Sequence, residues 1–199
     1  DEVSEQSIWQ ALAELIEEGI DEEWSLRCQS IVDGNGVDRV SAALTITAET
    51  PLLVRHARLT DEALLLAWAN DQETRQNSFS PDPISAEDHR RWFRSRLRDL
   101  DGCRLYVVET EEGIPVGQVR FERQEPAWVI SYSLAPQFRK RGLGRPLLKV
   151  ALLKMRSEYP GALVLGRVKP NNLPSRKIFE SLDFDTLSDG EGIAYQRIL

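Results

Sequence analysis

Residues 137–144 read Gln137-Phe138-Arg139-Lys140-Arg141-Gly142-Leu143-Gly144, and this stretch decides how the rest of the chain is interpreted. It follows an alternating apolar run over residues 128–134 and precedes an amphipathic segment over residues 143–155. We therefore predict a strand, a cationic glycine-containing turn and a helix. Such an arrangement aims backbone N–H groups and a helix N-terminus at one point, which creates an anion site. Five cationic side chains crowd the stretch, and no acidic residue lies between 134 and 156: Arg139, Lys140, Arg141, Arg145 and Lys149.

The chain as a whole is acidic, unlike this turn. Its 199 residues carry a net charge of −7, from 25 basic and 32 acidic side chains, which argues against general nucleic-acid binding. Two distant cysteines and two histidines predict neither a disulfide framework nor a metal site. No apolar run approaches the ~20 residues of a membrane span, and the acidic N-terminus does not resemble a signal peptide. We expect a cytoplasmic protein without membrane or nucleic-acid partners.

The first part of the chain, residues 1–48, is predicted to be a helical segment with little core of its own. Apolar residues recur at helical spacing over 8–16, 22–32 and 37–44, and residues 45–51 are typical of a linker. The chain contains one methionine, Met155, and begins with Asp1. We therefore expect Asp1 to be an internal residue of a longer protein or the result of trimming.

The second part, residues 52–199, is predicted to be one mixed α/β domain. A polar, irregular segment is expected over residues 70–83, and Thr60 and Ser85 are expected to cap the helices that follow them. Short turns predict mostly antiparallel strands, with one parallel pair around the glycine turn. The predicted strands cover residues 52–57, 104–109, 116–123, 127–134, 163–168, 184–187 and 192–198, and the predicted helices cover 60–69, 85–100, 143–159 and 172–182.

The pattern Arg139-x-x-Gly142-x-Gly144 is neither a P-loop nor a dinucleotide-binding fingerprint, since no G-K-[ST] and no third glycine follow. It resembles the pyrophosphate-binding turn of the GNAT acyl-CoA-dependent N-acetyltransferases, and the resemblance spans about residues 53–199. The preceding residues 132–136 are similar to the strand that splays around pantetheine, and residues 172–184 are similar to a later block of the family. The resemblance implies a GNAT fold, a central mostly antiparallel sheet flanked by helices, with acetyl-CoA as co-substrate and no metal. The cofactor-binding residues that it implies are Ser133, Leu134, Arg139, Lys140, Arg141, Gly142, Leu143, Gly144, Arg145, Asn172, Ser175 and Phe179.

Two positions depart from the family pattern. Phe179 stands where the family often has a tyrosine that protonates the leaving thiolate, and Asp183 stands where a glycine is usual, although aspartate tolerates left-handed geometry at a cost. Tyr132 is the alternative proton donor, and a core aromatic is its other interpretation. The resemblance also implies a glutamate base on a central strand. Glu122 is our candidate for it, while Glu122 and the neighbouring Glu125 can also be interpreted as solvated hairpin charges.

A second pattern begins at Trp68-Ala69-Asn70-Asp71 and ends at Trp92-Phe93. It resembles the W-x-N-D-x-x-x-R…H-x-x-W-F substrate loop of a subgroup that includes nucleotide-sugar N4-acetyltransferases of pseudaminic-acid-type pathways. Ribosomal-protein and polyamine acetyltransferases share this loop. A helix cap, a turn and a surface salt bridge are the alternative interpretations of the polar residues. The substrate-binding residues that the resemblance implies are Asn70, Asp71, Arg75 and His89.

Residues 26–40 resemble the last helices of a nucleotide-sugar hydrolase from the same type of pathway. This implies a fusion of a hydrolase with an acetyltransferase. Our prediction is an acetyltransferase that acts on a small-molecule amine, the 4-amine of a UDP-linked amino sugar, with a homodimer as the assembly. A protein or polyamine acetyltransferase, or a catalytically silent acyl-CoA-binding module, are the alternatives.

Overall fold

The computed structural model describes residues 9–10, 13, 40, 44–189 and 192–199. The chain divides into two units, residues 1–45 and 46–199, and the second unit contains almost all of the described residues. Most of the predicted N-terminal helices, and nearly all of the hydrolase-like stretch over residues 26–40, lie outside the described residues.

The second unit is built on a seven-stranded sheet with the order β1-β2-β3-β4-β5-β7-β6. Among the described strands only β4 and β5 pair in parallel, and every other neighbouring pair is antiparallel. Both features confirm the predicted mixed sheet. The strands are β1 Leu52–His56, β2 Cys103–Thr110, β3 Pro115–Gln124, β4 Ala127–Leu134, β5 Leu163–Val168, β6 Asp185–Asp189 and β7 Gly192–Ile198.

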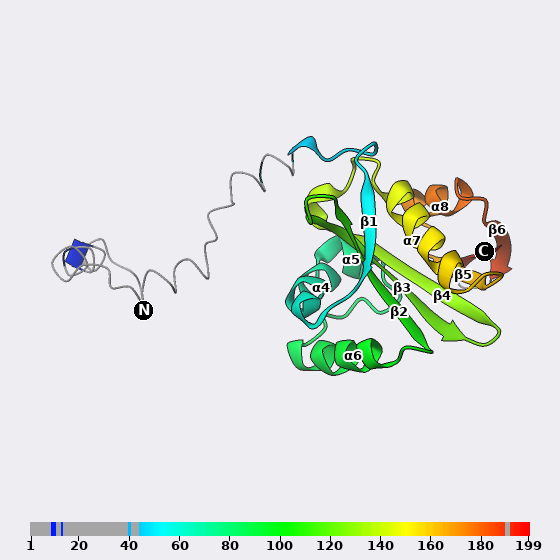
Figure 1. Ribbon diagram of the computed structural model, residues 1–199, viewed down its shortest axis with the longest axis horizontal. Helices are drawn as coiled ribbons and strands as arrows, with labels where there is room; N and C mark the ends of the chain where they lie inside the picture. Colours follow the sequence, from blue (N-terminus) through cyan, green and yellow to red (C-terminus); the bar gives the residue numbers. More distant parts are fainter. Residues whose placement is uncertain (1–8, 11–12, 14–39, 41–43, 190–191) are drawn as a thin grey trace. The chain divides into compact units, whose positions relative to one another are not determined.

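Helices cover both faces of the sheet (Figure 1). On one face α7 approaches so closely that a Cβ at Gly117 of β3 would lie 2.5 Å from a methyl group of Leu147, and α8 packs beside α7. On the other face α6 contacts β3 through an ion pair between Arg96 and Glu122, and α4 packs beside α6. The helices are α4 Glu62–Ala69, α5 Gln72–Asn77, α6 Ala86–Arg98, α7 Gly144–Glu158 and α8 Leu173–Glu180, with 3-10 turns η1 at Leu59–Asp61 and η2 at Pro136–Phe138.

Two local predictions on the α4 side were wrong. Thr60 does not cap α4, because a 3-10 turn occupies its position. The buried Asp61 carboxylate organises this turn instead, by accepting the N–H of Arg58 at 2.7 Å and pairing with Arg55 at 2.7 Å. The segment predicted to be irregular contains the helix α5. This helix has no apolar periodicity, and its start depends on a cap by Asp71, whose carboxylate accepts the N–H of Thr74 at 3.0 Å.

Two other local predictions are confirmed. Ser85 caps α6, because its hydroxyl accepts the N–H of Asp88 at 3.0 Å. Asp183, in the glycine position after α8, has a φ of 57°. This is the left-handed geometry that was expected there.

Candidate active site

The sheet opens between its two parallel strands. Residue pairs join β4 to β5 from Trp128 and Val164 as far as Ile130 and Gly166. Beyond that pair, β4 continues to Leu134 and β5 to Val168. The other edge of β4 stays paired with β3 up to Leu134. Over residues 131–134, β4 therefore directs peptide groups into an opening instead of a ladder. The predicted cofactor residues Ser133 and Leu134 lie there.

The cationic turn follows directly on the open end of β4. Lys140 and Gly142 have φ values of 61° and 76°, and such alternation turns successive N–H groups towards one side of the chain. The first turn of α7 adds donors, because Leu147 is the first residue to donate to a helical carbonyl, that of Leu143. The turn can thus hold a phosphate group with its backbone alone.

Glycine at residue 144 has a packing reason. A Cβ there would lie 2.5 Å from a methyl carbon of Ile178 in α8. The close approach of α7 to α8 requires this glycine, and it brings the start of α7 beside the helix that carries Asn172 and Ser175.

The charge of Arg139 is directed away from this turn. Its guanidinium is largely buried, pairs with Asp71 at 2.6 Å and Glu73 at 3.4 Å, and donates to the hydroxyl of Thr74 at 2.8 Å. Burial opposes the ionisation of Asp71, but Arg139 and the N–H of Thr74 hold the pKa of its carboxyl below its usual range. The predicted cofactor residue Arg139 and the predicted substrate residue Asp71 are therefore engaged with each other, which joins α5 to the turn.

The remaining cations of the turn are arranged differently. The guanidinium carbon of Arg141 lies 5.6 Å from the centre of the Phe138 ring. Lys140 and Arg145 are exposed. We therefore expect Lys140 and Arg145, more than Arg139, to lie beside an anion held by the backbone of the turn.

Two other predicted substrate residues, Asn70 and Arg75, hold the loop over residues 70–84 together. Asn70 exchanges two hydrogen bonds of 2.8 Å with the backbone of Ile84. Arg75 donates to the carbonyls of Ser80 at 3.1 Å and Asp82 at 3.3 Å. The contacts of Asn70 fit the turn interpretation. Arg75 bonds to backbone carbonyls, whereas the alternative interpretation was a surface salt bridge.

His89 lies inside the protein, on the buried face of α6. Its ring stacks on Phe93 at a centroid distance of 5.7 Å, and burial lowers its pKa. Because the side chain is almost completely covered, it has no surface to offer a substrate. The structure thus places His89 in the core, and its contact with a substrate stays a prediction.

Tyr132 occupies the opening on the α7 and α8 face. Its hydroxyl lies 2.9 Å from that of Ser175, and burial raises its pKa to about 12. Ser175 is itself held by Asn172, the cap of α8, whose side-chain oxygen accepts its N–H at 3.2 Å. The structure thus brings Tyr132, the predicted proton donor, together with Asn172 and Ser175, which were both predicted to bind the cofactor.

Phe179 lies beneath this opening, where its ring packs edge to face against Tyr132 at a centroid distance of 6.1 Å. It is 2% exposed, stacks on Tyr195 at 5.1 Å and packs against Phe184 edge to face. A Cβ at Gly166 would lie 2.6 Å from its ring. These contacts place Phe179 in the core beneath β5, and its contact with the cofactor stays a prediction.

Glu122 lies away from the opening. It stands opposite Val129, where β4 and β5 are still paired. Its carboxylate is held by Arg96 at 2.8 Å and Arg120 at 3.2 Å. Tyr132 is three residues further along β4 than Val129, which places it on the opposite face and about 10 Å along the strand. The structure does not bring the two predicted catalytic residues together.

The face of the opening opposite Tyr132 contains groups that were not predicted as site residues, among them Gln118 and Arg167. Ser133 accepts a hydrogen bond from Gln118 at 3.3 Å on the face opposite Tyr132. At the open end of β5, the guanidinium carbon of Arg167 lies 5.3 Å from the centre of the Phe79 ring, and Phe79 is 49% exposed. The alternation of side chains along β5 could have predicted that Arg167 lies on this face of the sheet. The position of Phe79 beside Arg167 depends on tertiary packing and could not have been predicted in this way.

Two searches of the described residues gave negative results. None of their helices is both long and apolar enough to cross a membrane. In the same part of the chain, no group of three or more His, Cys, Asp or Glu side chains is arranged to hold a metal ion.

Comparison with known proteins agrees with this geometry. Residues 51–185 match the family model of the acetyltransferase (GNAT) domain. None of the curated proteins matches the chain in sequence.

Solved structures share the fold at low sequence identity. A ribosomal-protein-alanine N-acetyltransferase from Brucella melitensis is 23% identical, with a TM-score of 0.61 over 74% of this chain and 99% of that one. A spermidine N-acetyltransferase from Vibrio cholerae, in complex with CoA and spermine, is 16% identical, with a TM-score of 0.65 over 74% and 94%. A Salmonella typhimurium acetyl transferase that modifies the N-terminal serine of ribosomal protein L7/L12 is 17% identical, with a TM-score of 0.63 over 77% and 98%.

Proposed function

Since the chain belongs to the GNAT acetyltransferase family and is an acetyl-CoA-dependent N-acetyltransferase, we propose that its acceptor is the 4-amine of a UDP-linked amino sugar. The observation that carries this proposal is the pair formed by Arg167 and Phe79 on the acceptor side of the opening. An exposed aromatic ring can stack on a nucleobase, and a guanidinium can pair with a diphosphate. The resemblance of residues 68–93 and 26–40 to proteins of nucleotide-sugar pathways supports the same acceptor.

The charge around the loop over residues 70–84 supports an anionic acceptor over a polyamine. Lys169 donates to the carbonyl of Gln76 at 2.8 Å, at the end of α5, and Arg167 lies two residues before it, in β5. The acids at the start of α5 are occupied, because Asp71, its N-cap, and Glu73, in its first turn, both pair with Arg139. A polyamine is cationic and would need carboxylates that face the opening. A nucleotide sugar is anionic and would need cationic side chains there.

Acetyl-CoA supplies the acyl thioester. In the proposed mechanism, the backbone of the turn over residues 141–145 binds its pyrophosphate, with Lys140, Arg141 and Arg145 beside it. Peptide N–H groups of β4 near Leu134 orient the pantetheine arm and polarise the thioester carbonyl. The neutral amine forms the new C–N bond as the C–S bond breaks. The Tyr132 hydroxyl gives its proton to the departing sulfur, and Ser175 fixes the direction of that hydroxyl. The nitrogen, which is positively charged after the attack, loses its proton to water, and the Tyr132 oxygen takes a proton back from water.

The substrate proposal is tested by following thiol release from acetyl-CoA. UDP-4-amino sugars, spermidine and peptides with free N-termini are compared as acceptors at equal concentration. We expect the highest kcat/KM with the nucleotide sugar. Because Arg167 contributes a charge-assisted contact, Arg167→Ala should raise KM for that acceptor about tenfold. Arg98→Ala, on the exposed end of α6, serves as the matched control.

Acetylation confined to peptides would overturn the acceptor proposal and leave the family assignment intact. It would favour protein N-terminal acetylation, which the ribosomal-protein acetyltransferases among the similar structures perform. Coenzyme A binding without transfer to any amine would favour a silent acyl-CoA-binding module, the alternative suggested by Phe179. A fusion with a nucleotide-sugar hydrolase, a homodimer and a cytoplasmic location stay predictions.

A further inference from the structure

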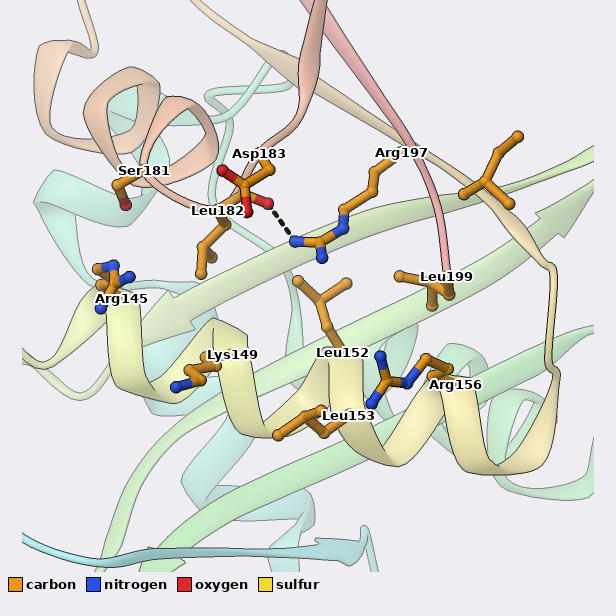
Figure 2. Close-up of a pocket in the computed structure, with 11 residues that line it drawn as sticks. Arg145, Lys149, Leu152, Leu153, Arg156, Ser181, Leu182, Asp183, Arg197 and Leu199 are labelled. Atoms are coloured by element: carbon orange, nitrogen blue, oxygen red, sulfur yellow. Dashed lines mark hydrogen bonds between the residues drawn. The ribbon is translucent and has the colours of Figure 1, made fainter.

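A second cationic pocket lies on the outer side of α7, beyond the turn (Figure 2). Its cavity volume is about 310 Å³, and its walls come from α7, the turn after α8 and the end of β7. Figure 2 shows Arg145 and Lys149 at one end of the pocket and Arg156 at the other, with Leu152 and Leu153 between them. None of the groups assigned above to acyl transfer, apart from Arg145 at its edge, contributes to it.

The cations of this pocket form one row along α7. Arg145, Lys149 and Arg156 are four and seven residues apart, so they lie on the same side of the helix. In the part of the chain that the structure describes, none of the three has an ion pair or side-chain hydrogen bond. Other arginines of this unit, such as Arg104 with Glu158, have an acidic partner. Three unpaired cations in a row on an acidic chain form a site for an anion.

The opposite wall adds a fourth cation and one acid. The guanidinium of Arg197 in β7 donates to the carbonyl of Leu182, which fixes it over the cavity (Figure 2). Asp183, held in left-handed geometry, is the one carboxylate side chain that lines the pocket. The balance of the described side chains in this pocket is four positive charges against one negative charge, which favours a ligand with several negative charges.

The floor between the cations is apolar. Leu152 and Leu182 are buried beneath it, and Leu153 is 45% exposed at its rim. A free phosphate or sulfate would gain nothing from these leucines. A ligand that joins a flat apolar group to phosphates would bury the group against them while its phosphates meet the arginines. A nucleoside phosphate has this chemistry.

We propose that this pocket binds a nucleoside phosphate at the same time as acetyl-CoA occupies the opening of the sheet. Arg156 is eleven residues further along α7 than Arg145, which corresponds to about 16 Å. The far half of the pocket, formed by Leu153, Arg156 and Arg197, is therefore separate from the turn that takes the pyrophosphate. In our proposal the ligand is a free nucleotide. The alternative is that the nucleotide part of acetyl-CoA, which has the same chemical groups, occupies this pocket.

The test is calorimetric titration of the full chain with ADP in the presence of saturating coenzyme A. We expect one ADP to bind per chain. Arg156→Glu should weaken ADP binding at least about tenfold, because it replaces an attractive charge with a repulsive one. The kcat/KM for acetyl-CoA should stay within about twofold, since Arg156 lies far from the turn. Arg98→Glu, a charge reversal of the same size on α6, should change neither quantity.

Two further measurements make the proposal falsifiable. Leu153→Asp should also weaken ADP binding, and inorganic pyrophosphate should bind more weakly than ADP, because the apolar floor contributes in our proposal. Displacement of ADP by coenzyme A would show that the pocket belongs to the nucleotide end of acetyl-CoA and would overturn the proposal. Unchanged ADP affinity in Arg156→Glu would overturn it as well.

Discussion

At the scale of single residues, this chain has Phe179 where the family often has a tyrosine that acts as the proton donor. Tyr132 is therefore our candidate for the proton donor. Only one hydroxyl pair at the opening, Tyr132 and Ser175, joins β4 to α8 in the described structure. We predict that Tyr132→Phe lowers kcat about 100-fold, the usual size of a general-acid contribution. The KM for acetyl-CoA should change little, because the ring that packs on Phe179 is retained.

Ser175→Ala should give a smaller loss of kcat, since it removes the partner that directs the hydroxyl and leaves the donor in place. Steady-state thiol-release assays of both variants measure these effects. Equal kcat in wild type and Tyr132→Phe would mean that the thiolate departs without help from this residue.

The same tyrosine has a consequence for stability at high pH. Burial raises its pKa from 10.0 to about 12 in the folded protein. The neutral side chain therefore makes a contribution to the unfolding free energy that is fully present below pH 10. This contribution is lost as the pH rises towards 12. We predict that wild type loses more unfolding free energy than Tyr132→Phe between about pH 9 and pH 11. Urea unfolding of both proteins at the two pH values tests this, and parallel losses would contradict it.

Restoring the family's tyrosine at position 179 should not restore a proton donor. The Phe179 ring is buried in the core among Gly166, Tyr195 and the ring of Tyr132. A hydroxyl added there would be buried without an evident partner, which costs about 1–3 kcal/mol. We predict that Phe179→Tyr lowers the unfolding free energy by that amount and does not raise kcat. A rise in kcat, measured beside the urea midpoint, would show that the ring can turn towards the sulfur.

At the scale of elements, the contact between α5 and the cationic turn links the two halves of the site. Arg139 and Asp71 are both mostly covered and lie 2.6 Å apart. A double-mutant cycle with Arg139→Ala and Asp71→Ala should give a coupling of about 1 kcal/mol at pH 7. The pKa of Asp71 is lower in the folded protein than in the unfolded chain. The coupling is therefore fully present when the pH is above the ordinary aspartate pKa. It disappears as the pH falls through the lowered pKa of the folded protein.

The measurement is urea unfolding of the four proteins at neutral and acidic pH. A matched cycle with Arg91 and Asp88, an exposed ion pair on α6, provides the control and should give a smaller coupling. A coupling near zero at pH 7 would show that the turn and α5 are held by other contacts.

The elements of the sheet could be predicted because their signals are local. The spans of β4, β5 and β7 match the predicted strands residue for residue, since alternating apolar residues bounded by turns leave little choice of register. The helix α5 was missed for the opposite reason. Six polar residues carry no apolar period, and their cap at Asp71 depends on a partner, Arg139, that lies 68 residues away in the sequence.

The site was predictable in its backbone and less so in its side chains. Residues 139–144 were placed correctly at the start of a helix after a strand, because glycine and charge mark such a turn. The destination of Arg139, the burial of His89 and the distance of Glu122 from the opening depend on which elements pack together. These are tertiary contacts that residue type and spacing do not encode.

At the scale of the whole molecule, the split of the sheet separates two kinds of chemistry. Tyr132 faces α7 and α8, where the sulfur of the proposed donor would leave. Arg167 and Phe79 lie on the other face, where the proposed acceptor would enter. Attack on a carbonyl and departure from it then occur on opposite sides of the opening. This division follows from the alternation of side chains along β4 and β5.

Residues 46–50, at the start of the second unit, pack against the cationic turn. Ile46 is buried, and residues 47–50 form a turn closed by the N–H of Thr50 on the carbonyl of Thr47 at 3.2 Å. A Cβ at Gly142 would lie 3.2 Å from that of Ala48, so this turn packs against the anion-binding backbone. Residues 46–51 therefore belong to the site, although the family match begins at residue 51.

We predict that a fragment of residues 46–199 unfolds at the same temperature as the full chain and has the same KM for acetyl-CoA, because this range is a compact unit. A fragment of residues 52–199 should lose about 1.5–3 kcal/mol from the missing Ile46 side chain alone. Its KM for acetyl-CoA should rise, since the turn loses its support at Gly142. Scanning calorimetry and thiol release on both fragments make the comparison. Equal KM values would show that the backbone of the turn keeps its shape without residues 46–51, and that the contact of Ala48 with Gly142 does not support cofactor binding.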